Sequence, residues 1–193
     1  MSTFPEYVND QPQVRRFTRK EYDSLVESGF FEEDEKVELL EGLILPMSPQ
    51  DPRHSRTIGR LSMQLSAQLI GRAEVLGHSP FAASDDSEPE PDLCVFPTTE
   101  DGNEHPTRAH CIIEVAFTSQ HRDRRKVAIY ARANVPQLIL IDVPKRKALV
   151  YRTPRDGDYE RIETHHEGTP IVIDAFPDVT IELANILPRL SST

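Results

Sequence analysis

Two short apolar segments constrain this chain most strongly, because each has the composition of a buried β-strand and each contains one carboxylate. They are Pro-Asp-Leu-Cys-Val-Phe at 91–96 and Cys-Ile-Ile-Glu-Val-Ala-Phe at 111–117. Apolar and β-branched runs of this length are typical of strands in the core of a sheet. An ionised carboxylate in such a strand costs roughly several kcal/mol unless a cation accompanies it. Asp92 and Glu114 therefore predict a site for a cation.

The alternation of side chains along a strand predicts that these two carboxylates meet. If the two segments pair as a hairpin across the loop 97–110, Asp92 and Glu114 lie on one face of the sheet near one end. The same alternation places Cys94 and Cys111 on opposite faces, which argues against a disulfide between them.

A helix and a further buried strand are expected next along the chain. Residues 123–133 show helical periodicity, with Lys126, Ile129, Tyr130 and Ala133 on one stripe. Lys126 would then lie at the edge of the buried face, near the sheet. The segment 138–143 has the composition of a buried strand. The order of strand with Asp, strand with Glu, helix with Lys and strand predicts an α/β fold.

The N-terminal part predicts a loose arm over 1–16 and then helices. Thr18 and Glu21 form a capping-box pattern, and Gly29 is typical of a helix stop. A second short helix is expected from about residue 34 to Glu41, and it would place Glu38 and Glu41 on one face. An exposed acidic face explains these two glutamates as well as a functional role does.

The remaining elements are predicted from turn residues and periodicity. A strand is expected at 43–47, a helix from Pro52 to Gly71, and another strand within 73–83. His54 falls on the apolar stripe of that helix, where a packed histidine is about twice as common as a ligand. Beyond the central segments, 148–151 and 159–163 read as a β-hairpin. Two short closing strands, at 171–173 and 179–181, and a last helical turn at about 182–187 follow.

Length and composition indicate one folded domain over residues 17–190. A chain of 193 residues is long enough for one sizeable core. No apolar run approaches the ~18 residues of a membrane span, and the N-terminus lacks the pattern of a secretion signal. The two cysteines, both in expected core strands, fit a reducing compartment. We therefore expect a cytoplasmic protein without a membrane span.

The charge balance argues mildly against nucleic-acid binding. The net charge is −10, whereas proteins that bind nucleic acids usually present a basic surface to the phosphates. A local basic cluster nevertheless lies at the start of the expected helix, with Arg122, Arg124, Arg125 and Lys126 in five residues.

At these residues the chain resembles the PD-(D/E)xK nuclease superfamily, and more closely the Uma-two family of restriction-endonuclease-like proteins. The matching stretches are 36–42, 47–54, 88–92, 113–115 and 125–136. The likeness covers about residues 17 to 187, and the ordered series is more specific than any single motif. It implies a restriction-endonuclease-like mixed β-sheet flanked by helices, with extra β-hairpins near the C-terminus. It also implies an endonuclease that cleaves DNA with Mg²⁺ or Mn²⁺, as a homodimer.

The resemblance further implies roles for individual residues. Asp92 and Glu114 would bind the metal, together with the backbone carbonyl of Val115 and a glutamate of the 36–42 segment. Glu38 is the better candidate for that glutamate and Glu41 the weaker one. The chain departs from the superfamily pattern at Ala116, where a lysine is expected. Lys126, from the following helix, would take that catalytic role.

Three basic residues complete the predicted site. The resemblance implies that His54 contacts a phosphate or supports the residues that bind the metal, and the guanidinium groups of Arg122 and Arg125 would hold neighbouring phosphates.

Two readings other than a DNA endonuclease stay open. The first is a nuclease-fold module that binds metal or a partner without turnover, which Ala116 and the acidic composition favour. In that case Asp92, Glu114 and Lys126 form a buried ion-pair network. The second is a metal-dependent hydrolase of another phosphoester.

Overall fold

The computed structural model describes residues 14–47, 51–98, 104–116 and 120–189, with the side chains of 120–123 left out. Most of the predicted N-terminal arm, residues 1–13, lies outside the described residues. Three helices and a helical turn accompany ten strands in this part of the chain.

A six-stranded mixed sheet forms the centre of the molecule, with the strand order β3-β4-β5-β6-β7-β8. Neighbouring strands are antiparallel except β5 and β6, which are parallel and are joined by the crossover helix α3. The α/β class and the mixed sheet predicted from the sequence are confirmed. The strands are β3 (Glu74–Leu76), β4 (Leu93–Phe96), β5 (Cys111–Ala116), β6 (Gln137–Asp142), β7 (Lys147–Arg155) and β8 (Asp158–His166).

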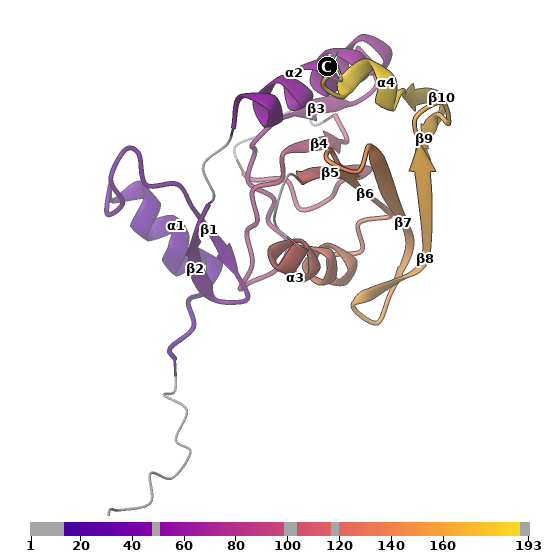
Figure 1. The fold of residues 1–193 in the computed structure, drawn as a ribbon. Helices are drawn as coiled ribbons and strands as arrows, with labels where there is room; N and C mark the ends of the chain where they lie inside the picture. The colour runs from indigo at the N-terminus through magenta and orange to yellow at the C-terminus, as the bar shows by residue number, and fades with distance from the viewer. Residues whose placement is uncertain (1–13, 48–50, 99–103, 117–119, 190–193) are drawn as a thin grey trace, which may run out of the picture.

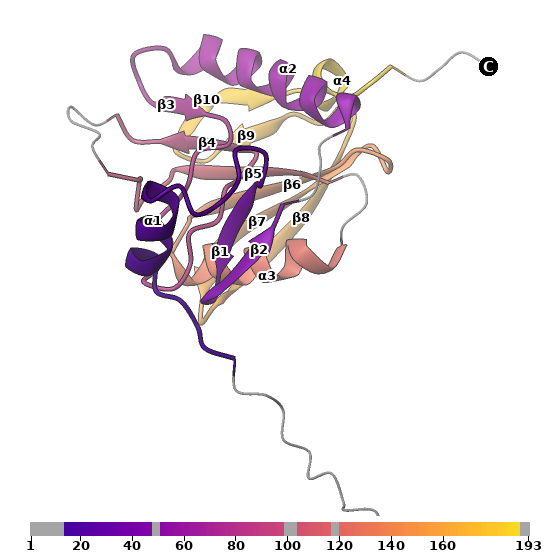
Figure 2. The ribbon, with the colours of Figure 1, turned by 90° about the vertical axis from the view of Figure 1, so that its left-hand side faces the viewer.

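Helices cover both faces of this sheet (Figures 1 and 2). One face carries α2 (Pro52–Leu69), the short α4 (Leu183–Ile186) and the separate pair β9 (Ile171–Ile173) and β10 (Phe176–Ile181). The other face carries α3 (Gln120–Arg132). The hairpin β7–β8 turns at Asp156 and Gly157, both with positive φ. This hairpin and the antiparallel pair β9–β10 confirm the predicted C-terminal hairpins.

Alternation along the strands divides the apolar interior into two cores. Cys111 and Ile113 pack with the leucines of α2, whereas Ile112 and Cys94 pack with Tyr130 of α3. The two cysteines are buried, free and on opposite faces, as predicted. The alternation also directs Glu114 towards the α3 face, which places its carboxylate beside that helix.

A small lobe of α1 (Arg19–Glu27), β1 (Val37–Leu40) and β2 (Leu43–Pro46) lies beside the main sheet (Figure 1). The predicted capping box is present: the Thr18 hydroxyl accepts from the Glu21 amide, and the Glu21 carboxylate accepts from the Thr18 amide. This reciprocal pair satisfies two backbone donors at the start of α1.

The predicted helix over 34–41 is wrong, because this segment forms the first strand of a hairpin. Glu41 and Gly42 make its two-residue turn with φ values of 51° and 75°. Positive φ at both positions is the turn geometry that matches the twist of paired strands. The three-residue spacing of Glu38 and Glu41 therefore does not place them on one face.

The predicted strand within 73–83 is shorter than expected and spans only β3. Beyond it, the backbone of 81–83 bonds to irregular segments instead of a strand partner, with Phe81 donating to Pro89 and Ala82 to Pro106. Pro80 lacks an amide hydrogen and cannot continue a ladder. No helix in the described part of the chain is both long and apolar enough to cross a bilayer.

Candidate active site

The two strand carboxylates lie at the same end of β4 and β5. Leu93 pairs with Ile113 in the antiparallel register, so the next pair outward is Asp92 and Glu114. Asp92 precedes β4, and its Oδ2 accepts a 2.7 Å hydrogen bond from the backbone amide of Val115. The structure thus brings together the two residues from which the sequence predicted a cation site.

Glu114 is held by two side chains of α3. The Tyr130 hydroxyl donates to its Oε1 at 2.7 Å, and Lys126 Nζ lies 3.3 Å from the same oxygen. Lys126 and Tyr130 are one helical turn apart, so they share the face that α3 turns to the sheet. Burial raises the pKa of Glu114 to about 7, although the neighbouring Lys126 ammonium opposes this shift.

Lys126 is buried between two carboxylates from distant parts of the chain. Its Nζ lies 2.9 Å from Glu38 Oε2 and 3.3 Å from Glu114 Oε1, and it donates to the Glu90 carbonyl at 3.3 Å. Burial alone would lower the pKa of Lys126, but Glu114 and Glu38 outweigh that effect and raise it. The side chain therefore stays an ammonium at neutral pH.

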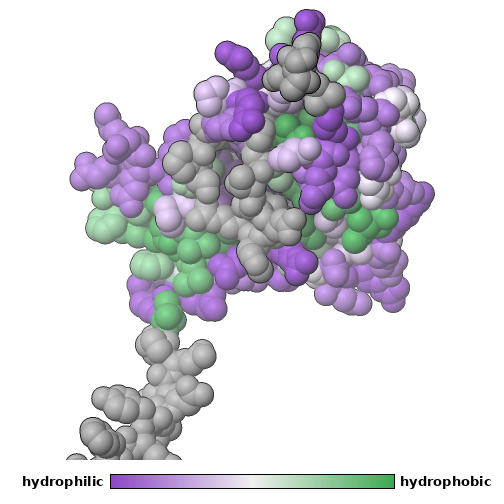
Figure 3. Space-filling model, in the orientation of Figure 1, coloured by the Kyte–Doolittle hydropathy of each residue, from purple (hydrophilic) through white to green (hydrophobic). Residues whose placement is uncertain are grey.

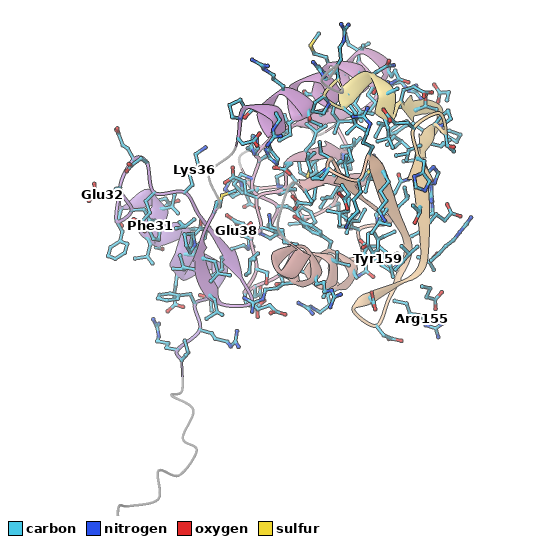
Figure 4. The ribbon with its side chains drawn as sticks, in the orientation of Figure 1. Phe31, Glu32, Lys36, Glu38, Arg155 and Tyr159 are labelled. Carbon is cyan, nitrogen blue, oxygen red and sulfur yellow. The ribbon has the colours of Figure 1, made fainter. Side chains whose placement is uncertain are left out.

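Strand β1 places Glu38 beside Lys126 and Glu114. Figure 4 shows Glu38 on the side of β1 that faces the main sheet. Its side chain is 4% exposed, and its Oε2 also accepts from the Glu90 amide at 3.2 Å. Glu41, the weaker candidate, points elsewhere: it pairs with Arg132 at 2.7 Å and with Arg125 at 3.6 Å. The hairpin turn separates the two glutamates.

His54 reaches the site from the first turn of α2. Its Nε2 lies 3.2 Å from Asp92 Oδ2, and its ring also bonds to the backbone of Val115. Burial lowers the pKa of His54, but the Asp92 carboxylate more than compensates and leaves it raised. The histidine predicted on an apolar stripe is thus packed against the carboxylate of the site.

The oxygen donors at this end of the sheet suit a hard divalent cation by their chemistry, because Mg²⁺ and Mn²⁺ prefer carboxylate and carbonyl oxygens. Asp92, Glu114 and Glu38 supply such oxygens. Side chains of the protein already contact these oxygens: His54 lies against Asp92, and the Lys126 ammonium lies between the two glutamates. Within the described ranges, no three acidic, histidine or cysteine side chains are gathered as a group that could hold a metal.

Two contributors to the site were not predicted as such. Tyr130 was assigned only to the apolar stripe of α3, although its position four residues after Lys126 places both on one face. The backbone of Glu90 contacts both Glu38 and Lys126. A backbone contact of this kind does not depend on the residue type, so no sequence pattern predicts it. The side chain of Arg122 lies outside the described residues, whereas Arg125 is exposed beside Glu41.

The buried Glu114 predicts a pH dependence of stability. Its folded-state pKa is raised from the usual 4.5 to about 7, so the folded protein binds the proton more tightly than the unfolded chain. The stabilising contribution of that proton is complete below about pH 4.5 and is lost as the pH rises through about 7. Glu114→Gln should remove this loss. Relative to the natural protein, Glu114→Gln should therefore become more stable as the pH rises. The difference between their free energies of unfolding should change in favour of the variant by up to about 3 kcal/mol between pH 4.5 and 8, as measured by urea titration. A constant difference would contradict the shift.

Comparison with known families decides the classification of the chain. Residues 19–184 match the model of the Uma2 family, whose description is "Putative restriction endonuclease". The chain belongs to the Uma2 family. The match contains Glu38, Asp92, Glu114 and Lys126. A comparison with curated proteins finds no match.

A solved structure shares the Uma2 fold of this chain. It is a crystal structure described as "a putative nuclease belonging to DUF820" from Anabaena variabilis ATCC 29413. The TM-score is 0.71 at 17% sequence identity, and the match covers 88% of this chain and 97% of the other. At this identity the likeness establishes that the two chains share one fold.

Proposed function

We propose that this Uma2 protein is a metal-dependent endonuclease that hydrolyses DNA phosphodiester bonds, with Asp92, Glu114 and Lys126 as its catalytic residues. The observation that carries the proposal is the buried Lys126 ammonium, which lies 3.3 Å from the Glu114 carboxylate at the strand end shared with Asp92. A buried cation and two strand carboxylates at one sheet end are the groups that phosphodiester hydrolysis needs.

The metal would be Mg²⁺ or Mn²⁺, bound by Asp92, Glu114, the Val115 carbonyl and Glu38. When bound, such an ion activates a water molecule and polarises the phosphoryl oxygen. The oxygen-only donor set supports the choice of a hard cation over zinc.

The protein's own side chains would position the reacting groups. Glu38 and the Glu90 carbonyl hold Lys126, so that its ammonium can orient the attacking water or offset the negative charge that develops on the phosphate. Tyr130 fixes one oxygen of Glu114, and His54 contacts Asp92. The remaining basic candidates, Arg122 and Arg125, would hold neighbouring phosphates.

Plasmid cleavage tests this proposal most directly. Supercoiled DNA incubated with Mg²⁺ or Mn²⁺ should be cut by the natural protein, and Asp92→Asn, Glu114→Gln and Lys126→Met should each lower the rate by at least about 100-fold. Lys145→Met is the matched control, because Lys145 lies on the surface in an ion pair with Asp142. Activity that survives in Lys126→Met would remove the lysine from the mechanism.

We also propose a homodimer in the cytoplasm. Two copies would place one site on each DNA strand, so linear plasmid should form together with nicked plasmid; nicking alone would argue against the dimer. The two free, buried cysteines support a reducing compartment. Recovery in a membrane or exported fraction after cell fractionation would contradict the cytoplasmic location.

A second candidate function is a nuclease-fold module that binds without turnover. It is favoured by Ala116, which stands where the superfamily has its lysine, and by the placement of Lys126 between the carboxylates. Calorimetric Mn²⁺ binding that depends on Asp92 and Glu114, without DNA cleavage under any metal, would select this function over the nuclease.

A further inference from the structure

A second concave site lies on the α1 lobe, in a pocket of about 820 Å³. It is bounded by α1, by the segment 31–37 and by residues near 80, 88–90 and 104–105. Asp92, Glu114 and Lys126 do not line it. Figure 4 shows Phe31 and Glu32 on the side of this lobe away from the main sheet.

The pocket is strongly acidic. The carboxylates that line it from α1, the following loop and the 88–90 segment are Asp23, Glu27, Glu32, Glu35, Glu88 and Glu90. The permanent cations among its lining residues are Arg19 and Lys36. Clefts lined by one sign of charge concentrate ligands of the opposite sign. An anionic ligand, including a DNA phosphate, is therefore disfavoured here.

Glu88 lines this pocket with a buried carboxylate oxygen that lacks a hydrogen bond. Its side chain is 3% exposed, yet no described residue gives its Oε2 a hydrogen bond. The nearest cations, Arg19 Nη1 and His105 Nε2, each lie 3.9 Å from a carboxylate oxygen. Burial, followed by the charge of Asp23, raises the pKa of Glu88. A buried carboxylate oxygen without a donor costs free energy, and an incoming N–H group would supply that donor.

Apolar side chains also line the pocket. The rings of Tyr22 and Phe31 are 6.1 Å apart, and Val26, Val37 and Pro80 also line the pocket. The Tyr22 hydroxyl already donates to the Val37 carbonyl, so the tyrosine offers the pocket mainly its ring. Figure 3 shows hydrophobic surface over this lobe beside hydrophilic residues. Aromatic rings attract cations, and apolar side chains accommodate methylene groups.

We infer that this pocket binds a linear aliphatic polyamine. Its ammonium groups would meet Glu88 and the surrounding carboxylates, and its methylene groups would lie against the rings of Tyr22 and Phe31. The volume falls within the range of small-molecule pockets, about 300–1,000 Å³. A compact metal ion fits less well, because it has no methylene groups to lie against these rings. The alternative occupant is a basic peptide of a partner protein, which an oligolysine peptide represents in the experiment.

The test is isothermal titration of the metal-free, DNA-free protein with spermidine at 0.15 M salt. Glu88→Gln keeps the shape of the side chain and removes its charge, and we expect it to weaken spermidine binding by at least about tenfold. Glu33→Gln is the matched control, because Glu33 is an exposed residue of the same loop that does not line the pocket. It makes the same change in net charge and should leave the Kd within about twofold.

Two further variants and one competing ion complete the experiment. Asp23→Asn tests the pocket from α1 in case Glu88→Gln does not fold, and Asp92→Asn should bind spermidine normally whether or not the nuclease proposal holds. Hexaamminecobalt, a compact trivalent cation without methylene groups, should displace spermidine less well than an equal concentration of spermine, because it cannot lie against the rings. Equal displacement, equal loss in Glu33→Gln, or binding of an oligolysine peptide without binding of spermidine would each overturn the inference.

Discussion

Replacing Lys126 with Met should lower the free energy of unfolding at pH 8 by about 3–5 kcal/mol, the largest loss expected from any single change at the site. Methionine fills a similar volume, so the loss arises from charge. Glu38 and Glu114, both buried, would lose the ammonium that lies 2.9 Å and 3.3 Å from their oxygens. A buried carboxylate without its counter-ion is strongly destabilising. Urea titration followed by circular dichroism measures the effect.

The controls separate this charge effect from general damage. Lys145→Met removes an exposed lysine paired with Asp142 at 3.2 Å and should cost no more than about 1 kcal/mol. Adding Glu38→Gln to Lys126→Met should recover part of the stability, because one of the two uncompensated carboxylates is removed. Under the proposed function, Mn²⁺ should stabilise Lys126→Met more than the natural protein, since the ammonium no longer competes for Glu38 and Glu114. Equal losses for the two lysine variants would contradict the buried ion-pair cluster.

Replacing Tyr130 with Phe should cost about 1.5–3 kcal/mol at pH 8 and less at pH 5. The Tyr130 hydroxyl donates to Glu114 Oε1 at 2.7 Å, and this hydrogen bond lowers the pKa of Glu114 against the effect of burial. Without the hydroxyl, the pKa of Glu114 rises further above 7. Removing the hydroxyl therefore destabilises the protein more when Glu114 is ionised than when Glu114 is protonated. The loss in the free energy of unfolding should accordingly increase with pH. If the protein is a nuclease, the acidic limb of its pH–rate profile should also move to higher pH.

Tyr159→Phe is the matched control for this change. Tyr159 lies in the same core as Tyr130, and its hydroxyl donates to the Val135 carbonyl at 2.9 Å. The variant loses one buried hydrogen bond but none to a carboxylate, so its cost should not depend on pH between 5 and 8. A pH-independent cost for Tyr130→Phe as well would show that Glu114 does not titrate in this range.

The central fold was predictable because its strands and its crossover helix are recognisable from local patterns of apolar and polar residues. The carboxylates of 91–96 and 111–117 interrupt otherwise apolar strands, and a hairpin between them allows one arrangement that brings both to the same face. The register of β4 and β5 agrees with that arrangement. The placement of Lys126 on the buried edge of α3 followed from helical periodicity in the same way.

The first strand of the N-terminal lobe, β1, was not predictable by these means. The segment 36–42 contains three charged residues and lacks the alternation of a strand. The spacing of its glutamates and apolar residues therefore favoured a helix. The turn at Glu41 and Gly42 instead pairs β1 with β2, and Leu39 also bridges to Glu88, far along the chain. Strand formation there depends on partners distant in sequence, whose energy a local pattern does not contain.

The sequence by itself therefore determined the sheet, the helix that crosses over it, and the meeting of Asp92 with Glu114, because alternation and helical period are local properties. Only the tertiary structure decided which contacts surround those carboxylates. Glu38 arrives on a strand, His54 arrives from α2, and the backbone of Glu90 closes around Lys126. The physical reason is that a buried charge is compensated by whichever groups the packing brings within hydrogen-bonding distance, and those groups come from segments far apart in the chain.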